Sequence, residues 1–443
     1  MKRLMLSAMH SGSGKTVATC ALLRAFQNRG LSVESFKCGP DYIDPMFHRQ
    51  VLGLPSRNLD LFLQGEAGVR AALAGQQSDL ALVEGAMGFY DGVNGTHRAS
   101  AWQVAETAGL PVVLVVRPRG ISLTLAAQVR GLLDFRSPSH LAGILLTDCK
   151  PMLYDHLRPI LDQTGLPILG YLPPMPEAVL ESRHLGLVTP DEVAGLQHRF
   201  DVIAGQMEKT VDLDRLLSLA AEGEREAFPE KTKPRCAIAV ARDEAFCFTY
   251  QESLEALELA GAELVFFSPL RDEPPIRAHG LYLCGGYPEL YAGTLSENTA
   301  MTAWIRQAVA QRMPTVAECG GFLYLLEKLK DDGGREWPMA AALPGESFPT
   351  GSLRRFGYLT LTADADSLLF RAGEPVPAHE FHYWEADRPG ADLLAEKPSG
   401  RAWRCGFASP TLYAGFPHLH LGGPLPLAAR FVRAALRYKE ASP

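Results

Sequence analysis

The first half of the chain alternates short apolar runs with longer segments in which apolar residues recur at helical spacing. An apolar run at residues 4–6 is followed by further runs at 31–36, 80–84, 112–116, 142–146 and 168–172. This alternation predicts a largely parallel β-sheet with helices on both faces. Ligands of such sheets bind at the carboxyl ends of the strands, so we expect functional residues in the loops that follow them.

A second alternating series occupies the rest of the chain. Strands are predicted at 236–241, 263–267, 280–284 and 313–317, and helices at 251–260 and 297–311. Past residue 334 we expect shorter strands at 358–363, 379–386 and 403–408, and then a closing helix at 427–439. Residues 222–234 are charged and interrupted by proline, which is typical of a linker. The sequence therefore predicts two α/β domains, at residues 1–222 and 235–443.

The first predicted strand leads through a glycine-rich turn into a helix over residues 16–26. Backbone amides at a helix N-terminus favour an anion, and glycines let the backbone approach phosphate oxygens closely. A lysine and a threonine at the end of such a turn suit the terminal phosphates and magnesium, respectively. We therefore predict that the turn binds ATP through Ser11, Gly12, Ser13, Gly14, Lys15 and Thr16. Met9 stands where this motif usually has its first glycine, and the alternative is a turn that carries a solvated lysine.

Two further loops carry acids at the same predicted edge of the sheet. The strand at 80–84 ends in Glu84, which we expect to hold Mg²⁺ together with the Thr16 hydroxyl. Asp91 follows on the next loop as a second acid, although an Asp-Gly turn explains it equally well. After the second strand come Lys37, suited to a phosphate or a substrate carboxylate, and Asp41, suited to a metal or a substrate group.

A second candidate site centres on Cys319, at a predicted sharp turn between a strand and a helix. Such a turn projects a nucleophile above the sheet, and the helix N-terminus stabilises its thiolate. The amides of the Gly285-Gly286 pair, which ends an earlier strand, are candidates for binding an oxyanion. The alternative for Cys319 is a buried structural thiol.

A cysteine nucleophile needs a base, and two histidines near the end of the chain are candidates. His418 and His420 share one side of an extended segment because alternate residues of a strand face the same way. We expect His418 to accept the proton of Cys319, and either His420 or an unidentified acid to orient His418. His420 is equally well explained as an ordinary strand histidine.

Composition narrows the classes of function. At 443 residues the chain is too long for one ordinary core, and its formal charge of −7 comes without a Lys/Arg run that would follow a nucleic acid backbone. It has no apolar span long enough for a membrane helix and no signal-peptide core, so we expect a cytoplasmic protein. Its eight cysteines include no C-x-x-C pair, which argues against a disulfide framework or a zinc site.

Several strings resemble the cobyrinic acid a,c-diamide synthase family, in order along almost the whole chain. They lie at residues 36–45, 56–60, 84–92, 170–173, 183–187 and 378–385. The first half of that family is similar to dethiobiotin synthetase and tolerates a missing first glycine in the phosphate loop. The second half resembles class I glutamine amidotransferases, in which the third catalytic residue is commonly a glutamate two residues past the base; here His420 occupies that position.

The resemblance implies a P-loop NTPase-like, doubly wound domain followed by a class I glutamine amidotransferase domain. It implies ATP-dependent amidation of the a and c carboxylates of cobyrinate in cobalamin biosynthesis, with nitrogen from glutamine or ammonia and an acyl phosphate intermediate. It places Asp41 and Asp91 among the catalytic residues, and Lys37, Asp41, Tyr42, Gly285 and Gly286 among the substrate-binding residues. Residues 378–385 match the family without an evident role.

Other interpretations remain open from the sequence. Relatives with nearly the same motifs amidate hydrogenobyrinate or nickel-sirohydrochlorin. The first half alone would also suit a ParA-like regulatory ATPase, although the additional early lysine of those proteins is absent and His10 lies nearby. The second half alone would suit an inactive amidotransferase fold used for binding, but Cys319 and His418 argue against this. The expected partners are small molecules, with no nucleic acid or membrane, and a homo-oligomer is left open.

Overall fold

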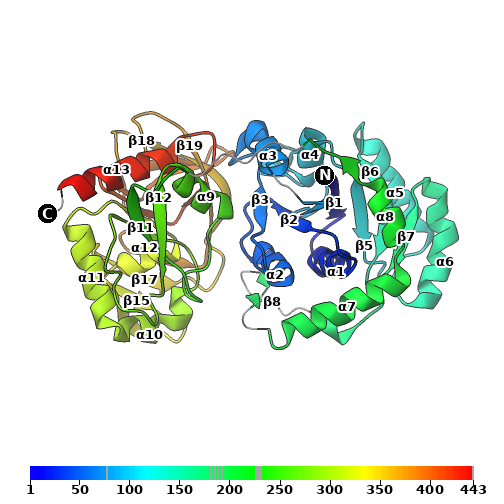
Figure 1. The fold of residues 1–443 in the computed structure, drawn as a ribbon, viewed down its shortest axis with the longest axis horizontal. Coiled ribbons are helices and arrows are strands. Elements are labelled where there is room, and N and C mark those ends of the chain that lie inside the picture. The colour runs from blue at the N-terminus through cyan, green and yellow to red at the C-terminus, as the bar shows by residue number, and fades with distance from the viewer. Residues whose placement is uncertain are drawn as a thin grey trace. The chain divides into compact units, whose positions relative to one another are not determined.

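The computed structural model describes residues 1–75, 78–179, 182–183, 186–187, 189–190, 193–224 and 232–441. The chain divides into two compact units, Met1–Phe228 and Pro229–Pro443, and each is described by itself (Figure 1). The predicted linker falls partly outside the described residues, as do His184 and Leu185 of the family string at 183–187. No described helix combines the length and apolarity needed to span a membrane.

The first unit is built around one sheet. Its strands are β1 (Lys2–Ala8), β2 (Val33–Cys38), β3 (Arg57–Leu59), β4 (Leu80–Glu84), β5 (Val112–Val116), β6 (Leu141–Leu146), β7 (Ile168–Tyr171) and β10 (Ala221–Glu222), and the short pair β8 (Ser182–Arg183) and β9 (Gly186–Leu187) lies apart. Its helices are α1 (Lys15–Asn28), α2 (Ile43–Leu52), α3 (Gly65–Ala74), α4 (Ala101–Ala108), α5 (Leu123–Phe135), α6 (Pro151–Leu161), α7 (Leu196–Thr210) and α8 (Leu213–Leu219).

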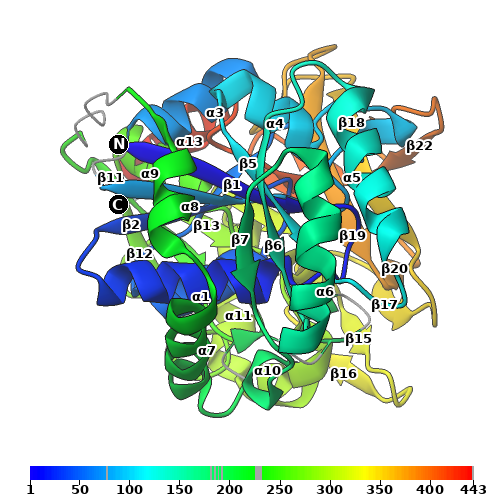
Figure 2. The same cartoon turned by 90° about the vertical axis from the view of Figure 1, so that its right-hand side faces the viewer.

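The strand order is β3-β2-β4-β1-β5-β6-β7, and all of these neighbours pair in parallel, while β10 adds antiparallel to β1. Helices α1 and α7 pack together on one face and α3 and α4 on the other (Figures 1 and 2). The strands are almost completely buried because helices cover both faces, which is why they read as continuous apolar runs. In the register of the sheet, Glu84 lies beside Leu6 of β1 and Lys37 of β2. Loops leaving these three strands therefore meet at one edge.

The second unit contains a central sheet and two smaller ones. The central order is β12 (Ala262–Phe267), β11 (Cys236–Ala241), β13 (Gly280–Leu283), β14 (Thr315–Glu318), β24 (Leu412–Gly415) and β23 (Phe407–Ser409), parallel except for the last pair. The smaller sheets are β16 (Glu336–Pro338), β15 (Lys328–Lys330), β17 (Glu346–Pro349), β20 (Trp384–Ala386), and β22 (Ala402–Cys405), β21 (Leu393–Glu396), β18 (Arg355–Ala363), β19 (Val376–His382), β25 (His418–Leu419). The helices are α9 (Gln251–Leu259), α10 (Ala292–Glu297), α11 (Thr299–Ala310), α12 (Gly320–Leu325) and α13 (Leu427–Ala441).

The fold class predicted from the sequence is confirmed, one predicted helix starts later than expected, and one predicted strand is divided. The helix expected at 297–311 is α11, which begins at Thr299 because the Asn298 side chain accepts a hydrogen bond from the Met301 amide (3.2 Å) and caps it; Glu297 ends the separate helix α10. The strand expected at 379–386 is β19 and β20, because β19 pairs with β18 whereas β20 pairs with β17 in another sheet.

Candidate functional site

The predicted phosphate loop joins β1 to α1 in a conformation that needs glycine. Gly12 (φ 77°) and Gly14 (φ 85°) both have left-handed backbone angles. A Cβ on Gly14 would lie 3.2 Å from Oγ1 of Thr147, whose hydroxyl donates to the carbonyl of Ser13 at 2.7 Å. Thr147, directly after β6, therefore packs against the loop and holds its backbone. Ser11 is exposed at its tip.

The ammonium of Lys15 points back into this loop. It donates to the carbonyl oxygens of Met87 (2.8 Å) and His10 (3.3 Å). Burial, and then the charge of Lys37, lower the pKa of Lys15 to about 8. These carbonyls hold the ammonium where the terminal phosphates of a bound nucleotide are expected.

Three oxygen-bearing side chains converge beside the loop. The Thr16 hydroxyl donates to Oε1 of Glu84 (2.9 Å) and lies 3.2 Å from Oδ1 of Asp44. The ammonium of Lys37 lies between the same acids, 2.8 Å from Glu84 and 2.5 Å from Asp44. Hydroxyl and carboxylate oxygens are the donors that Mg²⁺ prefers, and it commonly completes its shell with phosphates and water. The donor set therefore fits this ion.

Glu84 and Lys37 keep their charges although both are buried. Burial by itself raises the pKa of Glu84, but Lys37 and a hydrogen bond with Nε2 of His48 (2.8 Å) outweigh it, so the net pKa is lowered. Burial lowers the pKa of Lys37, but Asp44 and Glu84 outweigh it and the net pKa is raised. Asp44 and His48 were not predicted as site residues from the sequence. The sequence offers one signal for them: Asp44 lies three residues after Asp41, and His48 follows four residues later, one turn along the same helix.

The other predicted residues of this site lie at its margins. Asp41 accepts hydrogen bonds from the amides of Ile43 (2.9 Å) and Asp44 (3.1 Å), so it caps α2, and its carboxylate is 4.0 Å from Lys37. Tyr42 is the residue directly before α2. Asp91 is exposed and accepts a hydrogen bond from the amide of Gly88 (3.0 Å).

Within the described residues, no group of three or more His, Cys, Asp or Glu side chains has a metal-holding arrangement. Mg²⁺ at this site would therefore be coordinated by the Thr16 hydroxyl and the nucleotide phosphates as well as by carboxylates.

In the second unit, Cys319 sits at a strained bend between β14 and α12. Its φ of 46° is unusual for a residue other than glycine, and its side chain is 8% exposed. The following turn requires small residues, because a Cβ on Gly321 would lie 2.1 Å from the carbonyl oxygen of Leu283. Burial, and then the charge of Glu289, raise the pKa of the Cys319 thiol, whereas a hydrogen bond from the Gly320 amide lowers it.

The Gly285-Gly286 turn lies between the cysteine and the candidate base. A Cβ on Gly320 would lie 3.0 Å from the Gly286 nitrogen, and a Cβ on Gly285 would lie 2.4 Å from Cε1 of His418. The structure therefore brings Gly285, Gly286 and His418 to the bend that carries Cys319. The carbonyl of Gly285 is occupied by the Phe248 amide (3.0 Å).

Glu318, which the sequence reasoning did not consider, is the acid beside His418. It is 1% exposed, and its Oε2 lies 3.8 Å from Nδ1 of His418. The same oxygen accepts a hydrogen bond from the Tyr282 hydroxyl (3.1 Å), and Oε1 accepts one from the Leu419 amide (2.9 Å). A buried carboxylate directly before a candidate nucleophile was the signal that could have revealed it, because buried charges are rare unless they are paired.

His420 packs against an aromatic ring. Its ring centroid lies 5.0 Å from that of Tyr250, and burial lowers its pKa to about 4, so it is neutral at pH 7. Its role in orienting His418 stays a prediction.

Two family models match the chain. Residues 4–187 match a CobQ/CobB/MinD/ParA nucleotide binding domain, and residues 237–423 match a CobB/CobQ-like glutamine amidotransferase domain. A cobyrinate a,c-diamide synthase from Clostridium acetobutylicum is 35% identical over 98% of this chain and 100% of its own. Two others, from Salmonella typhimurium (37% identical, 98% of each chain) and Caldanaerobacter subterraneus (36% identical, 94% of each chain), match similarly. The chain belongs to the cobyrinate a,c-diamide synthase family.

Membership in the cobyrinate a,c-diamide synthase family confirms the resemblance found in the sequence. It also confirms the prediction of a glutamine-dependent, amidating carbon–nitrogen ligase. The nucleotide-binding model is shared with ParA-like proteins, but the full-length relatives named above are synthases.

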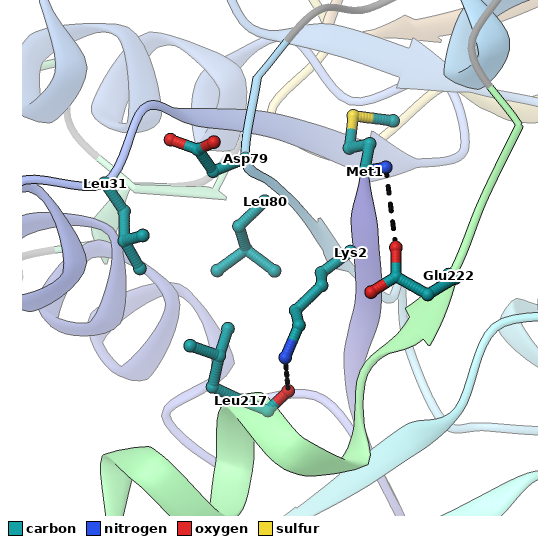
Figure 3. A pocket seen from close by; sticks show the side chains of 7 residues that line it. All are labelled: Met1, Lys2, Leu31, Asp79, Leu80, Leu217 and Glu222. Atoms are coloured by element: carbon teal, nitrogen blue, oxygen red, sulfur yellow. Dashed lines mark hydrogen bonds and ion pairs between the residues drawn. The ribbon is translucent and has the colours of Figure 1, made fainter.

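In the first unit, a cavity of about 270 Å³ lies away from the phosphate loop (Figure 3). Residues at the start of β1 and β4 line it, so it opens at the edge of the sheet opposite the phosphate loop. Its polar groups are already occupied. The ammonium of Lys2 donates to the Leu217 carbonyl (3.2 Å), and the N-terminus of Met1 pairs with Glu222 (3.6 Å) (Figure 3). The residues that line this cavity do not form a recognisable catalytic group.

Proposed function

We propose that this protein uses ATP, Mg²⁺ and glutamine to convert the a and c carboxylates of cobyrinate into amides. The observation that carries the proposal is the presence, in one chain, of a phosphate loop beside a buried acid–lysine set and of a Cys319 bend beside His418. The first suits activation of an acid, and the second suits release of ammonia. The substrate is inferred from the full-length relatives, which are cobyrinate a,c-diamide synthases.

At the first site, activation is needed because a carboxylate is a poor electrophile with a poor leaving group. Transfer of the γ-phosphoryl group of ATP to the carboxylate gives an acyl phosphate and ADP. Ammonia then attacks the acyl carbon, and phosphate leaves as the amide forms. The amides of residues 12–14 and the Lys15 ammonium bind the phosphates. Thr16, Glu84 and Asp44 would hold Mg²⁺, which supplies positive charge against the charge on the transferred group. Lys37 and Asp41 position the substrate carboxylate.

At the second site, Cys319 attacks the side-chain amide of glutamine. His418 accepts the thiol proton and returns it to the departing nitrogen, which leaves a thioester. The amides of the Gly285-Gly286 pair, with that of Gly320 beside Gly286, would bind the oxyanion that forms during this attack. Glu318 orients the imidazole of His418. Water then releases glutamate and restores the thiol.

A substrate panel tests the proposal. The protein is incubated with MgATP, glutamine and cobyrinate, hydrogenobyrinate or nickel-sirohydrochlorin, and the products are analysed by mass spectrometry. We expect diamide formation that requires both ATP and a nitrogen donor and is fastest with cobyrinate. Faster conversion of hydrogenobyrinate or nickel-sirohydrochlorin would make that compound, rather than cobyrinate, the assigned substrate. ATP hydrolysis without amide formation would overturn the proposal.

A further inference from the structure

Glu289 lies on the turn that forms one wall of the Cys319 site. It follows Pro288 in the short 3-10 segment Pro288–Tyr291, directly after the Gly285-Gly286 pair. This turn is pressed against the residue after the nucleophile: a Cβ on Gly320 would lie 2.8 Å from Cδ of Pro288 and 3.0 Å from the Gly286 nitrogen. Glu289 therefore follows by three residues Gly286, whose amide we assign to the oxyanion site.

Glu289 lies close enough to the nucleophile to influence it, and in the described part of the chain no cation of the protein accompanies it. Among the described residues it forms no ion pair, and the one charged neighbour that affects it is another acid, Asp332. Burial raises the pKa of Glu289 to about 8, although the side chain stays partly open to solvent. Of the neighbouring charges, that of Glu289 raises the pKa of the Cys319 thiol most. An acid in such surroundings is costly to ionise unless a cation joins it.

Glutamine carries the missing charge. Its α-ammonium is separated by a short methylene chain from the amide that Cys319 attacks, so it must lie near the wall of the site during the reaction. We infer that the Glu289 carboxylate binds the α-ammonium of glutamine and so selects glutamine over amides that lack it. This inference rests on the proposed function and assigns one end of its nitrogen donor. A charge-assisted hydrogen bond to a partly buried carboxylate gives both affinity and discrimination.

The test compares glutamine with glutaramate, which is glutamine without its α-amino group. Glutaminase kcat/KM is measured for both compounds in the wild-type protein and in Glu289→Gln, with competition against glutamine used where turnover of glutaramate is slow. The wild type is expected to prefer glutamine, and the variant to lose roughly 10- to 100-fold in kcat/KM for glutamine alone. Glu289→Asp should keep part of the preference.

Two controls separate this inference from a folding defect and from failure of the proposed function. Glu297→Gln removes an exposed acid of the same unit and should leave the preference unchanged. Amidation supported by ammonium salts should persist in Glu289→Gln, because that reaction bypasses glutamine. An undiminished preference in Glu289→Gln, or an equal loss for both amides, overturns the inference; a wild type that hydrolyses no glutamine overturns the proposed function instead.

Discussion

The hydrogen bonds of Glu318 make it a positioning residue that can be tested without unfolding the site. Glu318→Gln keeps an acceptor oxygen for the Leu419 amide, presents an NH2 donor to the Tyr282 hydroxyl oxygen, and removes the negative charge beside His418. We expect the kcat for glutamine hydrolysis to fall by roughly 10- to 100-fold with little change in KM, because the interaction develops as the imidazole gains a proton. Steady-state kinetics measures this split.

The matched control for Glu318→Gln is amidation with ammonium salts, which should continue at the wild-type rate. An equal loss with both nitrogen donors would show that Glu318 supports the fold rather than His418.

The residues that sequence reasoning found and missed differ in a physical way. Glycines, Lys15 and Cys319 stand in local strings whose backbone geometry the chemistry demands, so a linear pattern reveals them. Asp44 and His48 act through α2, which brings them onto the end of β4, and Glu318 acts across strands on His418. No local pattern encodes those meetings, because they depend on how elements pack.

The turn after Cys319 offers a prediction about an element rather than a functional group. Gly321→Ala would place a Cβ 2.1 Å from the Leu283 carbonyl, where only backbone movement can relieve the clash. We expect the second unit to lose about 1–3 kcal/mol of stability, and glutaminase activity to fall with it. Thermal and urea unfolding measure the loss. Gly131→Ala, in α5 with no atom within 4 Å of its Cβ, should be neutral or slightly stabilising.

The pairing of β19 with β25 predicts how stability depends on pH. His379 lies opposite His418, and burial, followed by the charge of His418, lowers its pKa to about 3. Below the unfolded-state pKa of about 6.5, the unfolded chain binds a proton that the native His379 refuses, so stability falls as the pH falls from about 6.5 towards 3.

By this linkage His379 costs about 2 kcal/mol of stability at pH 5. His379→Phe, which keeps an aromatic ring near Phe356 and Tyr358, should therefore lose less stability than the wild type between pH 7 and 5. Urea unfolding at the two pH values measures the difference. Equal losses in both proteins would contradict this assignment.

The order of strands and helices was largely predictable, since both central sheets are buried on two faces and their strands read as apolar runs. The division of one predicted strand into β19 and β20 was not, because it depends on a change of sheet partners. The start of α11 was predicted two residues early, since its position depends on the side-chain cap that Asn298 provides.

For the molecule as a whole, the proposed function divides the reaction between the units: the first activates a carboxylate by phosphorylation, and the second supplies nitrogen. Under this proposal, Cys319 is not needed when ammonia is supplied directly. Lys15 is needed with either nitrogen donor, because both reactions require phosphoryl transfer from ATP. The two sites should therefore respond differently to a change of nitrogen donor.

The most direct measurement is tetrapyrrole amidation with MgATP by Cys319→Ala, supplied in turn with glutamine and with an ammonium salt, beside Lys15→Ala. We predict that Cys319→Ala forms no amide from glutamine, a loss of roughly 1,000-fold or more, yet matches the wild type with ammonium. Lys15→Ala should fail with both donors. Amide formation from glutamine by Cys319→Ala, or its failure with ammonium while correctly folded, would contradict the account.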